Sequence, residues 1–159
     1  DLAGTGRFEA PSISIYPIDV KGDTSPLRVI QGSKTQLNWP GTMSLDPESG
    51  NLYVANDVGN SILVFRGTDS GDVAPARIIK GSATGLTSPV GVFVDGKNKE
   101  LWVANMGNAS ATVYRLTASG NAAPIRTIRS APVGKVSLKF GKTQAVVYDS
   151  KREQILVPN

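Results

Sequence analysis

The sequence repeats itself at a spacing of 49 residues. Two segments, 51–60 (NLYVANDVGN) and 100–109 (ELWVANMGNA), are near copies of one another. Each unit of a repeat protein packs mainly against its neighbours, so this period predicts an array of similar units. Four further positions recur in three copies at the same spacing: Gly22, Gly71 and Gly120; Pro26, Pro75 and Pro124; Arg28, Arg77 and Arg126; and the aromatic set Tyr16, Phe65 and Tyr114.

Each unit contains four short segments that are typical of β-strands. In one unit they are residues 91–95, 100–105, 110–116 and 125–128, which are rich in β-branched and aromatic residues and are separated by Gly, Asn and Asp. The ten prolines and 17 glycines of the chain recur in every window of helical length, which argues against helices. Four strands joined by short turns form an antiparallel meander. At a period of 40 to 50 residues, such a meander predicts one blade of a β-propeller.

The second strand of the unit is apolar on both faces. In segment 51–60, Leu52 and Val54 point to one side and Tyr53 and Ala55 to the other, whereas a half-exposed strand alternates apolar and polar residues. The sheet must therefore be covered on both faces, and neighbouring blades packed face to face provide this cover.

The boundaries of the predicted blades do not coincide with the first and last strands of the sequence. It opens on a third and a fourth strand (12–16 and 27–30), continues through two complete blades, and closes on a first and a second strand (145–149 and 154–157). This amounts to about three blades, whereas propellers have about 4 to 8. We predict an all-β propeller in which one chain forms half of a six-bladed ring that a second chain completes. Residues 1–159 form a single propeller segment, with repeat units 12–60, 61–109 and 110–159 after a lead at 1–11.

The predicted partner is another copy of the chain, or a second chain that completes the propeller. Its N-terminal half-blade would pair with the C-terminal half-blade of this chain, which removes two exposed sheet edges. The alternative is that the sequence is a fragment of a longer six-bladed chain. The predicted interface residues are Ile13, Ile15, Tyr16, Ile155, Leu156 and Val157.

One stretch carries a family resemblance. The pattern Pro-x-Gly-Val-x-Val-Asp (89–95), followed by Glu-Leu-Trp-Val-Ala-Asn (100–105) and a Ser-x-x-Val-Tyr strand (110–114), resembles the NHL-type repeat of six-bladed propellers. Residues 40–66 match less well, since Thr42 stands where the glycine is expected, and the C-terminal part departs further. The resemblance implies a propeller architecture; the family contains scaffolds, ligand binders and a few enzymes.

Composition restricts the chemistry. The chain has no His and no Cys, so we expect no zinc, copper, histidine-ligated haem or disulfide, and we predict no catalytic residue, metal ligand or cofactor. The net charge of +4 comes from scattered basic residues, so nucleic acid is an unfavoured partner. No apolar run approaches the ~20 residues of a membrane helix, so we expect no membrane insertion. A secreted or periplasmic bacterial protein is slightly favoured over other locations.

Three recurring sets of polar or aromatic residues admit two interpretations each. The acidic and amide sets could bind calcium at the channel mouth, as in gluconolactonase-like propellers, or accept turn hydrogen bonds in every blade, which we favour. The arginine set could bind polyanions or lie with its charge in water along an outer edge, which we favour. The aromatic residues could bind sugars, but we favour a role in the core between blades for the three that lie within strands. These sets are Asp46, Asp95 and Asp149 with Asn56, Asn105 and Asn159; Arg28, Arg77 and Arg126; and Trp39, Tyr53, Phe93 and Trp102.

The predicted function is therefore a non-catalytic binding or assembly module. The alternatives are a propeller hydrolase or lactonase with a calcium-like ion in the channel, and a weak polyanion binder.

Overall fold

The computed structural model describes residues 10–129, 132, 134–135 and 143–157. These residues form twelve strands, and their only helical element is one short 3-10 turn, η1 (Ser33–Thr35). The predicted all-β class is thus confirmed. The strands are β1 (Ser12–Ile15), β2 (Arg28–Gln31), β3 (Pro40–Leu45), β4 (Asn51–Asn56), β5 (Ser61–Arg66), β6 (Arg77–Ile79), β7 (Pro89–Asp95), β8 (Glu100–Asn105), β9 (Ser110–Arg115), β10 (Arg126–Ile128), β11 (Val147–Asp149) and β12 (Gln154–Leu156).

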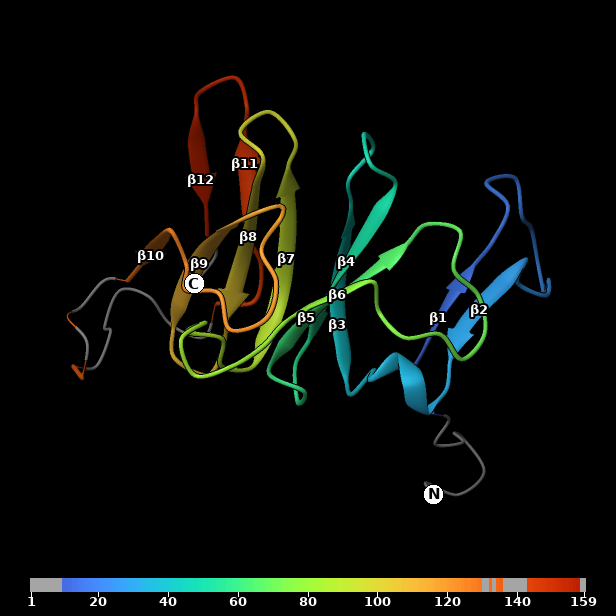
Figure 1. Cartoon of the computed structure of the whole chain (residues 1–159). Coiled ribbons are helices and arrows are strands. Elements are labelled where there is room, and N and C mark those ends of the chain that lie inside the picture. The colour runs from blue at the N-terminus through green and yellow to red at the C-terminus, as the bar shows by residue number, and fades with distance from the viewer. Residues whose placement is uncertain (1–9, 130–131, 133, 136–142, 158–159) are drawn as a thin grey trace, which may run out of the picture.

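The strands form four separate antiparallel sheets. Two are complete meanders, β3-β4-β5-β6 and β7-β8-β9-β10, and two are pairs, β1-β2 and β11-β12. Figure 1 shows the four sheets following one another in chain order, from β1-β2 on one side of the molecule to β11-β12 on the other. This is a partial propeller with two full blades between two half-blades, as the phase of the repeat predicts.

The register of the sheets repeats with the sequence. Tyr53 lies opposite Val64 in the first full blade, and Trp102, 49 positions later, lies opposite Val113 in the second. The predicted strand positions agree closely with the observed ones. The largest differences are that β7 begins two residues early, at Pro89, beyond a register shift, and that β11 begins two residues late, at Val147.

Apolar cores lie between successive sheets rather than inside any one of them. Tyr53, Ala55 and Ile62 of the first full blade pack against Val103 and Tyr114 of the second. The opposite face of the first full blade packs against β1-β2. The far face of the second full blade packs against β11-β12. The second strand of each full blade is therefore covered on both faces, as its two apolar faces predict, and burial of these faces is the main stabilising contribution to the array.

Candidate functional site

Backbone hydrogen bonds join the outer strands β2 and β6 to the blade that follows each of them. The Gly71 amide donates to the Val29 carbonyl over 2.7 Å, and 49 residues later the Gly120 amide donates to the Ile78 carbonyl over 2.7 Å. Both glycines have positive φ, 74° and 61°, which explains why glycine recurs here. Gly22 is the third member of the set and also has positive φ, 66°, but no described sheet precedes its own.

The recurring arginines reinforce the same junction. Arg28 donates to the carbonyls of Gly67 (2.7 Å) and Asp69 (3.2 Å), and Arg77 donates to the carbonyl of Ala118 (2.8 Å). The interpretation that these side chains lie with their charge in water is therefore wrong for Arg28 and Arg77. They reach across the gap between blades because turn carbonyls of the next blade lie there as acceptors.

Tyr53 completes the junction between the two full blades. Its hydroxyl donates to the Leu116 carbonyl (3.1 Å) and accepts from Arg77 (3.0 Å), whose guanidinium lies 5.7 Å from the ring centroid. Beside this junction lies a hollow of about 670 Å³, lined by acidic and basic side chains. Lys99 pairs with Glu48 there and Arg126 with Glu100, so the charges satisfy one another.

Arg77→Met is expected to lower the free energy of unfolding by about 1 to 2 kcal/mol, since hydrogen bonds from a charged group contribute about 1.5 to 3 kcal/mol and this group is only partly buried. Methionine keeps the apolar stem but removes the donors. Urea unfolding measures the change. Arg66→Met, at the exposed end of β5, is the matched control and should change stability by less than about 0.5 kcal/mol. Equal losses in both variants would contradict a junction role for Arg77.

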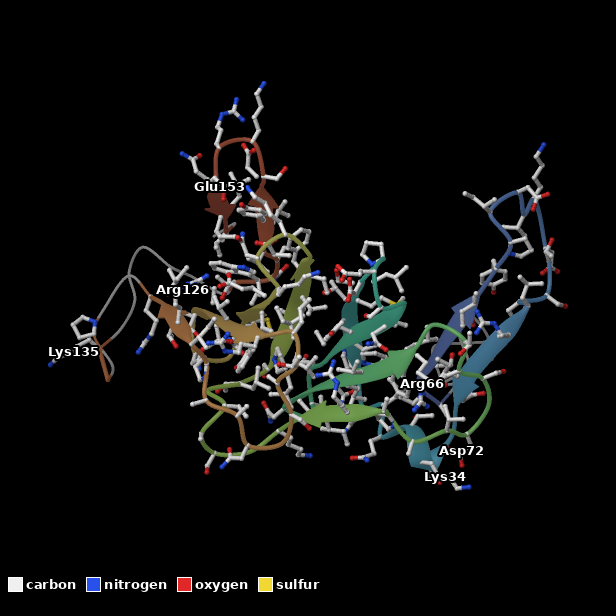
Figure 2. All side chains as sticks on the ribbon, turned by 45° about the horizontal axis from the view of Figure 1, so that its top comes forward. Lys34, Arg66, Asp72, Arg126, Lys135 and Glu153 are labelled. Carbon is white, nitrogen blue, oxygen red and sulfur yellow. The ribbon has the colours of Figure 1, made fainter. Side chains whose placement is uncertain are left out.

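The third copy of the junction differs, because within the described part of the chain no third strand of a following blade faces it. Arg126 forms two hydrogen bonds to the Glu100 carboxylate, at 2.8 and 2.5 Å, and lies 5.3 Å from the centroid of the Trp102 ring. The hydrogen bond to Glu100 raises the pKa of Arg126 above its ordinary value. Trp102 is 95% buried, yet its Nε1 has no hydrogen-bond partner among the described residues. Figure 2 shows Arg126 below Glu153 in the view, on the side of the molecule that carries the C-terminal half-blade.

Large apolar side chains are exposed at both ends of the array. At one end, Val147 and Leu156 are half exposed on β11-β12. At the other, Met43 and Leu45 are exposed on β3, although the equivalent Val92 and Val94 of β7 are buried beneath the preceding blade. Met43 is 53% exposed and Val92 only 8%, so the difference comes from the missing neighbour and not from the residue type.

The residues predicted at the interface fall into two groups. Ile13 and Ile15 pack inside the chain against Val54, Leu63 and Phe65, and Ile155 and Val157 pack near Trp102. Tyr16 and Leu156 are exposed. The interface role of these six residues remains a prediction.

The recurring aspartates hold turns. Asp46 accepts hydrogen bonds from the Glu48 amide (3.1 Å) and the Ser49 hydroxyl (2.5 Å); the Ser49 bond is the main reason that the pKa of Asp46 lies below its usual range. Asp95 and Asp149 accept from the turns that follow them in the same way. The predicted turn role of the aspartates is thus confirmed. Among the described residues, no three acidic, histidine or cysteine side chains gather to form a metal site.

The recurring asparagines hold the loop that enters each blade. Asn56 is buried, accepts from the Asn38 amide (2.6 Å) and donates to the Gln36 carbonyl (3.1 Å). Asn105 accepts from the Thr87 amide in the equivalent loop. Asn159, the third member of the set, lies outside the described residues.

Three of the four aromatic candidates belong to cores between blades, as predicted. Tyr53, Trp102 and Phe93 pack there, whereas Trp39 is exposed in the loop before β3. In the described part of the chain, no helix has the length and apolar character to cross a membrane.

The sequence matches no protein-family profile and no curated protein. Many solved structures match this chain, and two of them are hydrazine synthase and Hsv2. Hydrazine synthase from Kuenenia stuttgartiensis is 18% identical over 80% of this chain, with a TM-score of 0.57. Hsv2 from Kluyvelomyces marxianus is 16% identical over 76% of this chain and covers 44% of its own length, with a TM-score of 0.44. This chain spans 32% of the hydrazine synthase chain, and that likeness supports the β-propeller-type fold alone.

Proposed function

We propose that this chain is a non-catalytic propeller scaffold of the NHL type, which acts in binding or assembly and whose ring is completed by propeller strands of another chain. The observation that carries the proposal is the pair of open half-blades. Within the described residues, β1 pairs only with β2 and β12 only with β11. Each half-blade thus presents one strand edge with free amide and carbonyl groups.

Unpaired edges are a liability that natural proteins usually cover, because they pair with other chains and promote aggregation. Here the edges coincide with exposed apolar side chains, Leu156 beside one and Tyr16 at the end of the other. Both features disappear when complementary strands add to the half-blades. The turn roles of Asp46, Asp95 and Asp149 favour a structural function for these carboxylates over ion binding in the channel.

Two copies joined in tandem within one polypeptide test the proposal. They contain the strands of six four-stranded blades, so we expect closure of the ring within the single chain. Expected results are a melting temperature that is higher than that of the single copy at high dilution, and weaker binding of an apolar fluorescent dye per copy. A tandem chain that melts like the diluted single copy and binds as much dye per copy would contradict ring completion.

A further inference from the structure

We propose that the completing chain is a second copy of this one, and that its segment 16–22 docks on Trp102 and Arg126. This inference rests on the proposed function and names its partner. It is carried by the unpaired Nε1 of Trp102, which is a buried polar atom at a position where the one other described copy, the Tyr53 hydroxyl, has an acceptor.

The strand register defines the composite blade. In both full blades, the second strand pairs with the third in the same register, so that Leu52 lies opposite Phe65 and Leu101 opposite Tyr114. In β12 Ile155 directly follows Gln154, and in β8 Leu101 directly follows Glu100. The two strands pair with the first strand of their blade in the same register, so Ile155 occupies the position of these leucines. Tyr16 occupies the position of the aromatic residues, 49 residues before Phe65. The composite blade therefore places Ile155 opposite Tyr16 of the second copy.

The same register places Leu156 opposite Ile15 of the second copy, as Tyr53 lies opposite Val64. The side chain of Ile15 stays in its own core, and only its backbone joins the new strand pair. The residue that would pair with Ile13 is Pro158, which lies outside the described residues. The second copy thus contributes the backbone edge of β1 to this contact, and Leu156 contributes its side chain.

Trp102 provides the docking site. It stands where Tyr53 stands in the preceding blade, and the Tyr53 hydroxyl donates to the Leu116 carbonyl. Ile18, two repeats before Leu116, is fully exposed in the free chain. Its carbonyl in the second copy would accept the Trp102 Nε1 proton. Burial of a donor without an acceptor is unfavourable, so this contact would remove a real penalty.

Two more contacts of the junction would form at the same place. Arg77 donates to the Ala118 carbonyl, so Arg126 would donate to the carbonyl of Val20 of the second copy. The Gly120 amide donates to the Ile78 carbonyl, so the Gly22 amide of the second copy would donate to the carbonyl of Thr127 in the first copy. A hollow of about 340 Å³, lined by Trp102, Arg126, Tyr148, Glu153 and Ile155 among others, lies open where this segment would dock.

The apolar surfaces are complementary in position. Val147 and Leu156 lie on the face of the half-blade that points away from Trp102. In the closed ring this face would cover Met43 and Leu45 of the second copy, as β3 covers Val92 and Val94 of β7. A two-fold arrangement makes both composite blades identical, so one pair of surfaces accounts for both open ends.

Sedimentation of the single-copy protein tests the partner. We expect a dimer at micromolar concentration, twice the 16.7 kDa of one chain. Leu156→Asp should raise the dimer dissociation constant at least about 100-fold, because it places a charge in the composite core. Leu156 is half exposed, so the variant protomer should still fold. Val58→Asp is the matched control, with a side chain that is equally exposed (56%) in a turn away from both ends, and it should remain dimeric.

The indole protons give an independent result. The chain has two tryptophans, and Trp39 is exposed, so Trp39→Phe assigns the two indole signals. The Trp102 Nε1 proton is already buried in the single protomer, so the expected effect of the new acceptor is a downfield shift of its signal in the dimer, and dilution into the monomer range should reverse that shift. The Trp39 signal should not change. Trp102→Phe should weaken the dimer about tenfold.

The outcomes separate the two proposals. A monomeric single copy together with a tandem chain that closes would refute the second copy as partner and leave ring completion intact. A monomer together with an open tandem chain would refute both. A dimer whose Trp102 indole proton is unaffected by dilution, or that Leu156→Asp and Val58→Asp weaken equally, would refute the docking of segment 16–22.

Discussion

Gly81→Ala is expected to lower the free energy of unfolding by about 3 to 5 kcal/mol. Gly81 has φ of 139°, a region that residues with a side chain rarely adopt. An added Cβ would also lie 2.6 Å from Cγ of Asn121, far inside normal contact distance. The Asn121 side chain accepts the Ala83 amide over 2.7 Å, so moving it breaks a hydrogen bond between blades.

The contact is repeated one blade earlier, which indicates that it belongs to the architecture. Gly32 has φ of 131°, and a Cβ there would meet Asp72, whose carboxylate accepts the Lys34 amide over 2.7 Å. Figure 2 shows Asp72 beside Lys34. Gly32→Ala should therefore be as destabilising as Gly81→Ala.

Urea unfolding of Gly81→Ala and of a control, Gly96→Ala, measures the effect. Gly96 has no atom within 4 Å of an added Cβ and no positive φ, so its substitution should change stability by less than about 0.5 kcal/mol. If Gly81→Ala were as stable as the Gly96→Ala control, the turn after β6 would have to be more adaptable than its backbone angle indicates.

The architecture could be predicted because local patterns determine it. Tyr53 and Val54 are adjacent and both apolar, which alone requires a sheet covered on both faces. The turn residues separate the strands, and the 49-residue period places equivalent strands in register. The half-blades at the ends followed from the same period.

The contacts between blades could not be predicted in the same way. Arg28 and Arg77 were placed correctly on outer strands, but their acceptors are backbone carbonyls 39 to 41 residues later, and a carbonyl has no sequence signal. The unpaired Nε1 of Trp102 depends on which neighbour is absent. One signal was present but was not recognised: Gly32 and Gly81 recur at the repeat spacing, as do Asp72 and Asn121, which are the partners of these glycines.

The free energy of unfolding is expected to fall by about 2 kcal/mol between pH 10 and pH 12 because of Tyr114. Burial raises the pKa of Tyr114 to about 12, since the phenolate would lose its hydration in the core between blades. Its hydroxyl donates to the Thr84 carbonyl over 2.5 Å, which also requires the protonated form. In the unfolded chain the same group ionises near pH 10. The stabilisation is therefore complete below pH 10 and is lost as the pH rises toward 12.

Tyr114→Phe separates this effect from other alkaline titrations. The exposed groups Lys97, Lys99 and Tyr148 also have raised pKa values, because each forms a hydrogen bond with a glutamate, and they contribute to the pH dependence of both proteins. The variant should be less stable than the parent at pH 8, where the hydrogen bond to Thr84 is lost, by about 1 kcal/mol. The difference between the two proteins should shrink above pH 10 and then reverse, because phenylalanine cannot ionise. If the difference in unfolding free energy between the two proteins stayed constant from pH 8 to pH 11.5, Tyr114 would ionise equally easily in the folded and unfolded chains. That result would contradict an effect of its burial between the two full blades on its pKa.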